Sequence, residues 1–339
     1  MSSPAERPVR FGVLGCADIA LRRMLPALSA SRCATVAAVA SRDLVRAEEA
    51  VRRFGGVALG SYEALLRRSD VDAVYVPLPI TLHAEWIERA LLAGKHVLAE
   101  KPLSTGQDSA VRLFRLARQT GRQLAENAMF LHHSQHQAVR DLLAGGAIGD
   151  LRAVTGVFAV PPRPASDIRY RSELGGGALH DIGFYPLRAA QMLLGPGLRL
   201  AGAVLRQDVG RGVDLSGSVL LHTRDGVTAT LRFGMENSYQ AEYALIGEAG
   251  RIELTRAFTP PADHRPVVRV DGPDGIREVT LPADDQFANV VGAFVRAVRS
   301  GSDPAGQAAH AAEVIEHARL AEAVRREAVR IPVTAAVWA

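Results

Sequence analysis

Lysine is rare in this chain, and one of its two lysines follows directly after an apolar run. The chain has 40 lysine and arginine residues, of which only Lys95 and Lys101 are lysines. An ammonium group can lose its proton when it is buried, whereas a guanidinium cannot. Lys101 stands between Glu100 and Pro102, after the run 97–99, and is therefore a candidate catalytic group. The alternative is a solvated surface lysine, which is what we expect of Lys95.

A glycine turn at residues 12–20 has the composition of a phosphate-binding loop. Gly15 begins a small-residue version of the dinucleotide-binding fingerprint, with Ala17 and Ala20 in place of the second and third glycines. Backbone N–H groups in such a turn, together with the N-terminus of the following helix, can bind a pyrophosphate. A tight turn without a ligand is the alternative. The predicted cofactor contacts are Gly15, Cys16, Ala17, Asp18 and Ile19.

The residues after the second predicted strand favour a 2'-phosphate. An acidic residue that binds the cofactor ribose is expected about 20 residues after the glycines. The chain has Ser41 and Arg42 there, ahead of Asp43. We therefore predict NADP(H) in preference to NAD(H), with Arg42 pairing with the phosphate and Ser41 donating a hydrogen bond. Ser41 could also cap a helix, with Arg42 in solvent.

The elements that must position these residues follow a βα-repeat pattern from residue 9 to residue 125. Short β-branched runs predict buried parallel strands, and stretches with helical spacing lie between them. This half of the chain is thus predicted to be a doubly wound parallel sheet with right-handed crossovers. The expected strands are 9–14, 35–40, 73–76 and 96–99, and the expected helices are 19–28, 44–54, 82–92 and 109–118.

The stretch after residues 73–76 leaves the predicted sheet at the carboxyl edge, where doubly wound sheets bind ligands. Pro77 and Pro79 keep this stretch extended. We expect Pro77, Leu78 and His83 to lie at the cofactor. A structural role is the alternative for His83.

The second half of the chain predicts a different architecture. Alternating runs separated by Gly and Asp turns predict an α+β domain with a large, open, mostly antiparallel sheet. The exposed face of that sheet needs a cover, and another subunit would supply one, so we expect a homo-oligomer. The predicted domains are 1–126 and 127–339. The expected strands are 153–160, 216–222, 228–233, 243–246, 251–254 and 329–333, and the expected helices are 286–299 and 306–327.

Composition excludes several function classes. A chain of 339 residues with 48% hydrophobic residues can bury a sizeable core. Its net charge of +4 is scattered, which argues against nucleic-acid binding. Without a secretory leader or membrane-span pattern, we expect a cytoplasmic protein with no membrane partner. Cys16 and Cys33 have no CxxC spacing, and we expect both to be reduced and buried.

Four motifs together resemble the Gfo/Idh/MocA family, which is named after glucose-fructose oxidoreductase and inositol dehydrogenase. They are the glycine turn, Pro77 with His83, residues 94–102 and residues 175–185, in that order. The resemblance spans nearly the whole chain. It implies an N-terminal Rossmann domain, a C-terminal domain whose open sheet forms a homodimer or homotetramer, and hydride transfer between NAD(P) and a sugar or polyol.

The resemblance also implies which residues react. The lysine of Glu-Lys-Pro in this family faces the nicotinamide and the substrate, a role that maps to Lys101 with Glu100 beside it. Many members have His where this chain has Tyr185, four residues after Asp181. Tyr185 is similar to the tyrosine of glucose-fructose oxidoreductase, dimeric dihydrodiol dehydrogenase and the sugar 3-ketoreductases of deoxysugar biosynthesis. Arg188 stands where many His-type members have Asp, which argues against the inositol dehydrogenase branch.

A phenol and an ammonium group suit the reduction of a ketone, which needs a hydride and a proton. Tyr185 is the predicted proton donor, and Lys101 would stabilise the phenolate and polarise the carbonyl. Tyr185 could also be a packing aromatic. The glycine run 175–177 permits close backbone approach to a ligand, or forms a flexible loop. The family places Asp181 in the substrate pocket, where it could hold a sugar hydroxyl or cap a helix.

An Arg–Tyr cluster before the glycine run indicates the substrate class. Arg163, Arg169, Tyr170 and Arg171 would suit a nucleotide diphosphate, although a solvated loop is equally compatible. We predict NADPH-dependent reduction of a keto group, at C3, on a dTDP-linked keto-deoxysugar. The alternatives are an NADP-dependent aldose or dihydrodiol dehydrogenase and a non-catalytic NADP-binding sensor. The predicted substrate-binding residues are Lys101, Asn127, Phe130, Tyr170, Arg171, Asp181 and Tyr185.

His132 and His136 invite a metal interpretation because their spacing would place them on one helix face. No carboxylate or cysteine with ligand spacing accompanies them, and hydride transfer needs no metal. We therefore predict no metal site.

Overall fold

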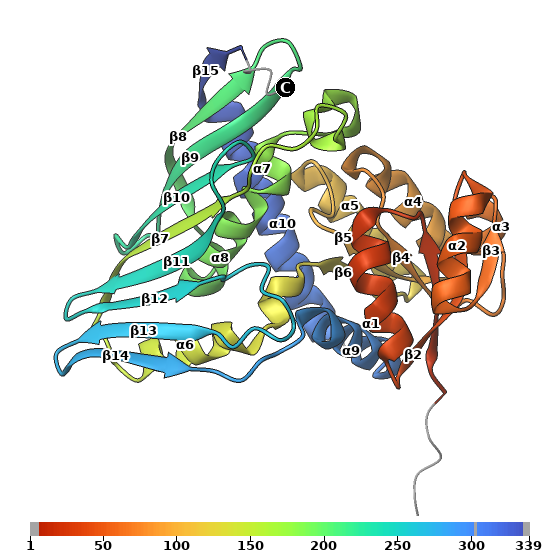
Figure 1. Cartoon of the computed structure of the whole chain (residues 1–339), viewed down its shortest axis with the longest axis horizontal. Coiled ribbons are helices and arrows are strands. Elements are labelled where there is room, and N and C mark those ends of the chain that lie inside the picture. Colours follow the sequence, from red (N-terminus) through yellow and green to blue (C-terminus); the bar gives the residue numbers. More distant parts are fainter. Residues whose placement is uncertain (1–6, 302–303, 335–339) are drawn as a thin grey trace, which may run out of the picture. The chain divides into compact units, whose positions relative to one another are not determined.

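The computed structural model describes residues 7–301 and 304–334 (Figure 1). The chain forms two compact units, and each unit includes a segment from near the C-terminus. The domain boundary between residues 126 and 127 stays a prediction. The first unit comprises Met1–Ser104, Asp108–His132 and Phe287–Val314, and the second comprises Thr105–Gln107, His133–Gln286 and Ile315–Ala339.

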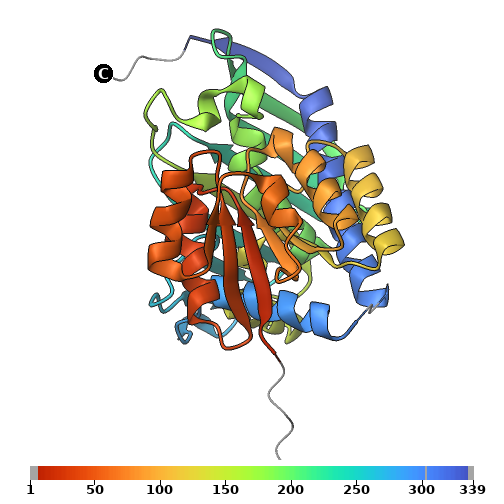
Figure 2. The ribbon, with the colours of Figure 1, turned by 90° about the vertical axis from the view of Figure 1, so that its right-hand side faces the viewer.

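The first unit contains a six-stranded sheet with the order β3-β2-β1-β4-β5-β6. Every neighbouring pair is parallel. The order reverses between β1 and β4, as in a Rossmann fold, and helices lie on both faces of the sheet (Figure 2). This confirms the predicted doubly wound sheet. The strands are β1 (Val9–Leu14), β2 (Ala34–Ala40), β3 (Val57–Leu59), β4 (Ala73–Val76), β5 (His96–Glu100) and β6 (Leu124–Asn127).

Local sequence explains these strands and helices. All four residues of β4 are buried, as expected for a parallel strand that is covered on both faces. Asp43 caps one helix by accepting a 3.1 Å hydrogen bond from the amide of Val45, and Ser61 caps the next by accepting one from Ala64. The helices around this sheet are α1 (Leu25–Ala30), α2 (Leu44–Phe54), α3 (Tyr62–Leu66), α4 (Ile80–Leu92), α5 (Gln107–Thr120) and α9 (Gln286–Arg299).

The helix predicted over residues 19–28 is not uniform. A π-helical turn, Ala20–Met24, precedes α1. Pro26 lies in the first turn of α1 and has no amide hydrogen to donate to the carbonyl of Arg22. The α-helical hydrogen-bond series is therefore interrupted at this point.

The second unit contains a nine-stranded sheet with the order β14-β13-β12-β11-β7-β10-β9-β8-β15. Two of its strand pairs, β7 with β10 and β8 with β15, are parallel, and the other pairs are antiparallel. The predicted large, mostly antiparallel sheet is confirmed. The strands are β7 (Leu151–Ala159), β8 (Arg199–Asp208), β9 (Val213–His222), β10 (Thr228–Gly234), β11 (Gln240–Gly247), β12 (Arg251–Thr255), β13 (Val267–Gly272), β14 (Gly275–Thr280) and β15 (Val329–Val333).

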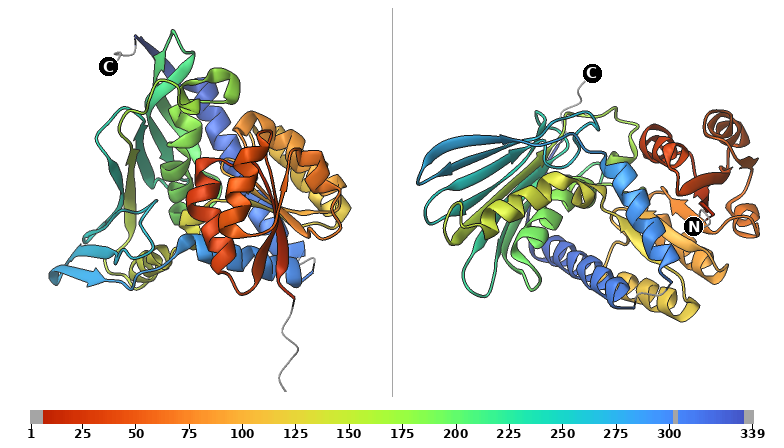
Figure 3. Two further views of the ribbon diagram at one scale, coloured as in Figure 1. Left: turned by 45° about the vertical axis from the view of Figure 1, so that its right-hand side comes forward. Right: turned by 90° about the horizontal axis from the view of Figure 1, so that it is seen from below.

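One face of this sheet packs against helices. Gly183, between α7 (Ala178–Asp181) and α8 (Phe184–Leu194), leaves room for Phe233, because a Cβ there would lie 3.1 Å from the ring. The opposite face carries exposed apolar side chains, among them Val204, Leu220 and Ile331. Figure 3 shows this face without a covering helix over the described part of the unit. The remaining helices of the unit are α6 (Ser134–Ala144) and α10 (Pro304–Glu327), of which α10 begins in the first unit.

Two predictions about single residues are wrong. Lys95 is buried, not solvated, and it donates hydrogen bonds to backbone carbonyls before β4. Cys33 is half-buried, whereas Cys16 is buried, and both thiols are free. Within residues 7–301 and 304–334, no helix is long and apolar enough to cross a bilayer.

Candidate active site

Five residues predicted to bind the cofactor or the substrate lie at one edge of the six-stranded sheet. Gly15 follows β1, Ser41 follows β2, Pro77 follows β4 and Lys101 follows β5, while Asn127 is the last residue of β6. Because the strands are parallel, all five positions belong to the carboxyl edge. The strand order reverses between β1 and β4, so this edge also holds the switch point at which such sheets bind ligands.

The glycine turn after β1 requires a residue without a side chain at position 15. Gly15 has a φ of +114°, and a Cβ there would lie 3.1 Å from Leu78 and 3.5 Å from the Tyr62 hydroxyl. Glycine is also required at position 12, but for helix packing, because a Cβ there would lie 2.4 Å from the side chain of Leu65 in α3. The turn is therefore closely packed at Gly15 and admits no side chain there, and its contact with a pyrophosphate stays a prediction.

Arg46 of α2 ties the second helix to this turn. Its Nη2 donates a 2.6 Å hydrogen bond to the carbonyl oxygen of Cys16. Burial raises the pKa of the Cys16 thiol, and the Arg46 guanidinium opposes that shift. Ala17 and Ile19 are half-buried, and Asp18 forms an exposed ion pair with Arg22. Of the five residues predicted in this turn, Gly15 and Cys16 are buried, and the carbonyl of Cys16 accepts its hydrogen bond from a cation.

The end of β2 presents a hydroxyl and two cations. Ser41 accepts a 3.2 Å hydrogen bond from the amide of Asp43, and Asp43 itself caps α2, so the cap interpretation of Ser41 is wrong. Arg42 is exposed and interacts with the phenol of Tyr62, whose pKa is raised by burial. Since the Asp43 carboxylate is engaged by the helix, Arg42 and Arg46 make this end suitable for a phosphate.

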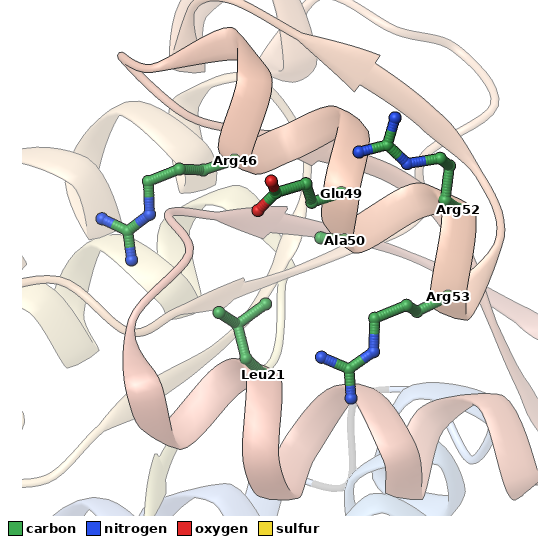
Figure 4. Close-up of a pocket in the computed structure, with 6 residues that line it drawn as sticks. All are labelled: Leu21, Arg46, Glu49, Ala50, Arg52 and Arg53. Carbon is green, nitrogen blue, oxygen red and sulfur yellow. The ribbon is translucent and has the colours of Figure 1, made fainter.

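A surface pocket lies between the π-helical turn and α2 (Figure 4). Two of the lining residues also contact the glycine turn: Arg46 through the carbonyl oxygen of Cys16, and Leu21, whose amide donates to the carbonyl oxygen of Ala17. The Arg46 guanidinium points away from those of Arg52 and Arg53 in Figure 4. None of the residues predicted to bind cofactor or substrate lines this pocket. The lining residues are Leu21, Arg46, Glu49, Ala50, Arg52 and Arg53.

Glu100, directly before Lys101, is buried and accepts several hydrogen bonds. Its Oε1 accepts a 2.6 Å bond from the Tyr75 hydroxyl and a 2.5 Å bond from the Asn127 amide. Burial raises the pKa of Glu100, while these donors and the Lys101 ammonium oppose the shift. Asn127, a predicted substrate residue, is therefore engaged by Glu100 and fully buried.

His83 connects the stretch after β4 with the segment after Lys101. Its Nε2 lies 2.8 Å from the carbonyl oxygen of Leu78, and its Nδ1 lies 3.0 Å from that of Pro102. Burial lowers the pKa of His83, and the Lys101 ammonium lowers it further. A neutral imidazole carries one N–H and so donates to one of these carbonyls. These contacts give His83 a structural role, and its cofactor contact stays a prediction.

Tyr185 lies in the second unit, within an aromatic cluster. Its ring centroid is 4.7 Å from that of Phe158 and 5.7 Å from those of Phe184 and Phe258. The residue is 6% exposed. Three aromatic neighbours fix the ring direction, so the packing role and the proton-donor role are compatible.

Asp181 pairs with Arg169, which also binds Asp167. The Asp181 carboxylate raises the pKa of Arg169 above its usual range. The glycine run 175–177 packs closely on this region, because a Cβ at Gly176 would lie 2.5 Å from the carbonyl oxygen of Arg169. The close backbone approach that these glycines allow is thus to the chain itself.

The residues of the Arg–Tyr cluster each contact a different partner and do not form one group. Tyr170 is buried, and the guanidinium of Arg211 lies 4.6 Å from its ring centroid. The amide of Arg163 donates a 3.3 Å hydrogen bond to the Tyr170 hydroxyl. Arg171 forms an exposed ion pair with Glu173. Tyr170 is therefore the buried member of the cluster, and a cation from outside the cluster, Arg211, lies against its ring.

The helical pairing of His132 with His136 is wrong. His132 ends a short 3-10 turn, Met129–His132, and α6 begins afterwards, so the two residues share no helix. The Nδ1 atom of His136 lies 2.9 Å from the Tyr243 hydroxyl, and Phe130 is fully buried. No cluster of three metal-ligating side chains occurs in the described ranges.

Four residues that contact predicted site residues were not predicted from the sequence. Arg46 follows Arg42 at helical spacing, which could have indicated a second cation. Tyr75 is the one hydroxyl in the apolar strand β4, which could have indicated a buried hydrogen bond. The sequence offers no local signal for Tyr62 beside the glycine turn or for Arg211 above Tyr170.

Known proteins match this chain over most of its length. The family model described as an oxidoreductase family with an NAD-binding Rossmann fold, GFO_IDH_MocA, matches residues 9–128, and the model of the GFO/IDH/MocA C-terminal domain matches residues 136–253. A dTDP-3,4-didehydro-2,6-dideoxy-alpha-D-glucose 3-reductase from Streptomyces violaceoruber is 56% identical over 328 residues, which are 95% of this chain and 96% of that protein. The enzyme of the same name from Actinomadura kijaniata is 54% identical over 305 residues, 90% of this chain and 92% of that protein.

One solved crystal structure is similar to this chain over nearly its whole length. The crystal structure of KijD10, a 3-ketoreductase from Actinomadura kijaniata in complex with NADP and TDP-benzene, has a TM-score of 0.94 and 52% sequence identity. The match covers 96% of this chain and all of that one.

Proposed function

Because this chain belongs to the GFO/IDH/MocA family of oxidoreductases, we propose that it uses NADPH to reduce the C3 keto group of a dTDP-linked keto-deoxysugar. The observation that carries the proposal is the 56% identity, over 95% of the chain, to a 3-reductase of such a sugar. Lys101, at the carboxyl edge of the Rossmann sheet, supplies the cation that this chemistry needs.

The cofactor is NADP(H). Ser41 and Arg42 follow β2, and Arg46 reaches the glycine turn, so the phosphate of an adenosine ribose would meet a hydroxyl and two cations. The similar KijD10 structure contains NADP. When bound, NADPH supplies the hydride that reduces the ketone.

The protein supplies the proton. Tyr185 donates its phenolic proton to the carbonyl oxygen of the sugar as negative charge develops there, and the phenolate then takes a proton from solvent. A general acid of this kind contributes about 10² to 10⁴ in rate. A phenol has an unperturbed pKa of about 10, so it needs a neighbouring positive charge to donate readily. The ammonium group of Lys101 provides that charge and polarises the carbonyl.

Three of the residues proposed to bind the substrate, Tyr170, Arg171 and Asp181, belong to the second unit. Tyr170, with Arg211 above its ring, is suited to an aromatic base and a diphosphate. Arg171 is an exposed cation close to Tyr170 in sequence, and Asp181, which pairs with Arg169, would accept a hydrogen bond from a sugar hydroxyl. Asn127 and Phe130 complete the predicted substrate contacts.

The exposed face of the nine-stranded sheet is the proposed interface of a homodimer or homotetramer. Val204, Leu220 and Ile331 are between 38% and 47% exposed on neighbouring strands. Light scattering on the purified protein tests this. A monomer at micromolar concentration would contradict it, and Leu220→Arg is expected to weaken the assembly.

Substitution of the two reacting residues tests the mechanism. Tyr185→Phe keeps the ring in its aromatic cluster and removes the proton, so kcat is expected to fall by about 10² to 10⁴ while NADPH binding remains. The kcat of Lys101→Ala is expected to fall by a similar factor. Lys101→Arg is also expected to fail, because the guanidinium is larger and cannot share a proton with a phenol. Full activity of Tyr185→Phe would remove the proposed acid. NADPH binding without turnover of any keto sugar would favour a non-catalytic sensor.

A further inference from the structure

The connection after β12 contains a residue with a strained backbone. Arg256 directly follows β12 and has a φ of +49°. Within residues 7–301 and 304–334 it is the one residue other than glycine with a positive φ. This left-handed conformation is unfavourable for a residue with a Cβ, and it persists only where the surrounding structure holds it. The contacts of the two residues that follow therefore indicate what maintains it.

The residue after Arg256 is fixed through both of its backbone polar groups. The amide of Ala257 donates a 2.8 Å hydrogen bond to the carbonyl oxygen of Ala241 in β11. The carbonyl oxygen of Ala257 accepts a 3.0 Å hydrogen bond from Nε2 of Gln135 in α6. Gln135 and Ala257 are fully buried. The chain is thus bound to a strand and to a helix directly before Phe258, which sets the direction in which the Phe258 side chain leaves the backbone.

The ring of Phe258 lies against the ring of Tyr185. Their centroids are 5.7 Å apart with an interplanar angle of 48°, and Phe258 is fully buried. Phe158 of β7 contacts both rings, with centroid distances of 4.7 Å to Tyr185 and 5.3 Å to Phe258. Each of the three rings therefore contacts the other two, and removal of the Phe258 ring would leave space beside Tyr185.

A second pair of residues supports Phe258. The ring centroid of Tyr243 lies 6.5 Å from that of Phe258, and the Tyr243 hydroxyl lies 2.9 Å from Nδ1 of His136 in α6. The rings of His136 and Tyr243 are also stacked, with centroids 5.7 Å apart. His136, which the sequence suggested as a metal ligand, is thus part of the packing around Phe258. All of these residues belong to the second unit.

We propose that Phe258 is a positioning residue for Tyr185, and that Gln135 and His136 of α6 hold Phe258 in place. The proposal rests on the function proposed above, in which Tyr185 donates the proton. The phenol must reach the carbonyl oxygen at hydrogen-bond distance, and a misplacement of about 1 Å can lower a rate about 100-fold. Phe258 has no proton to donate, so it acts on the reaction through the ring of Tyr185.

Phe258→Leu in the full chain tests the proposal. Leucine keeps the position apolar and removes the ring, so Tyr185 gains room to turn away from its present direction. Crystal structures of the wild type and the variant are expected to differ by about 1 Å or more in the position of the Tyr185 hydroxyl, and kcat is expected to fall about 10- to 100-fold. The Kd for NADPH is expected to stay unchanged, because the predicted cofactor contacts belong to the first unit.

Phe11→Leu is the matched control. Phe11 is also fully buried, and its ring centroid lies 5.7 Å from that of Phe294 in the first unit. The control therefore loses one buried aromatic contact of the same length, far along the chain from Tyr185. We expect it to be destabilised in urea to a similar degree and to keep the kcat of the wild type.

Gln135→Met is a second variant, which leaves every ring of the aromatic cluster in the chain. It removes the donor to the carbonyl oxygen of Ala257, so the backbone before Phe258 is held less firmly. We expect kcat to fall about 3-fold, which corresponds to the loss of one hydrogen bond. This variant tests the proposal by the same measurements if Phe258→Leu does not fold.

A double variant separates positioning from a general loss of structure. In Tyr185→Phe no phenol remains to be positioned, so adding Phe258→Leu is expected to leave the residual kcat unchanged. A further fall by the same factor as in the single variant would overturn the inference, because Phe258 would then act by another route.

The crystal structures and the kinetics distinguish the two proposals. A Tyr185 hydroxyl that keeps its place in Phe258→Leu would overturn the inference, whatever the activity. A displaced hydroxyl with an unchanged kcat would support the positioning and overturn the proposed role of Tyr185 as the acid. If no keto sugar is reduced by the wild type, the proposed function fails, and the position of the hydroxyl alone decides whether Phe258 positions Tyr185.

Discussion

The ammonium group of Lys95 donates a 2.8 Å hydrogen bond to the carbonyl oxygen of Val71. It donates a second, of 2.6 Å, to the carbonyl oxygen of Arg68, and the residue is 7% exposed. Lys95 directly precedes β5, and Lys101 directly follows it. The two lysines of the chain therefore stand at opposite ends of one strand, where one donates to backbone carbonyls and the other has the catalytic role proposed above.

The two lysines are expected to respond differently to the same substitution. Lys95→Met leaves two carbonyls without their donor, so the free energy of unfolding should fall by about 1 to 3 kcal/mol with kcat unchanged. Lys101→Met should leave stability within about 0.5 kcal/mol and reduce kcat at least 100-fold. Urea unfolding measures the free energy of unfolding of each variant, and steady-state kinetics measures its kcat. Equal stability of Lys95→Met and the wild type would contradict the hydrogen-bond assignment.

Gly177→Ala should destabilise the second unit. Gly177 has a φ of +122°, and a Cβ there would lie 2.5 Å from an oxygen of Asp214. We expect a loss of about 2 to 4 kcal/mol in the free energy of unfolding, because strain and a steric clash add. Gly202→Ala in β8 is the control, since a Cβ there would meet nothing within 4 Å. Equal stability of the two variants, measured in urea, would show that the loop adjusts freely.

Arg42→Ala should change the cofactor preference. A charge-assisted hydrogen bond to a phosphate is worth about 1.5 to 3 kcal/mol, so the ratio of kcat/KM for NADPH to that for NADH should fall about 10- to 100-fold. Arg52→Ala removes an exposed arginine from α2, the helix that follows Arg42, and is expected to leave the ratio unchanged. An unchanged ratio in Arg42→Ala would refute the phosphate contact.

Asp214 should make stability depend on pH. Burial raises the pKa of Asp214 from 3.8 to about 6, although it accepts a 2.6 Å hydrogen bond from the amide of Leu179. The folded state then binds the proton more tightly than the unfolded state, so this contribution to stability is largest below pH 4 and is lost as the pH rises to about 6. In the wild type, this group should lower the free energy of unfolding by about 2 kcal/mol between pH 4 and about pH 6, and Asp214→Asn should abolish that decline. Urea unfolding from pH 4 to pH 7 measures it, and parallel curves for variant and wild type would contradict it.

Much of the fold could be predicted because local patterns suffice for it. The helices α2 and α9 and the strand β15 have the predicted bounds, since each combines a clear apolar period with defined ends. The three-residue strand β3 has no such period and pairs only with β2. The π-helical turn before α1 depends on how Pro26 is accommodated in three dimensions, which no periodicity records.

The candidate site could be predicted only in part, for a related reason. Gly15 and Lys101 follow strands, and parallel strands end at one edge, so their shared location follows from the pattern. The bond between Tyr75 and Glu100 joins residues 25 apart in the chain, and the contact between Arg46 and Cys16 joins residues 30 apart. Such contacts depend on strand order and helix packing, which are tertiary properties.

The central claim is that the enzyme reduces a nucleotide-linked keto sugar with NADPH. The most direct measurement incubates the purified protein with NADPH and a panel of dTDP-linked keto-deoxysugars beside free aldoses, and follows the absorbance of the reduced nicotinamide. We expect NADPH oxidation with a dTDP-linked 3-keto sugar, and a new hydroxyl-bearing carbon at C3 in the NMR spectrum of the product. Turnover only with free sugars, or none with any keto sugar, would contradict it.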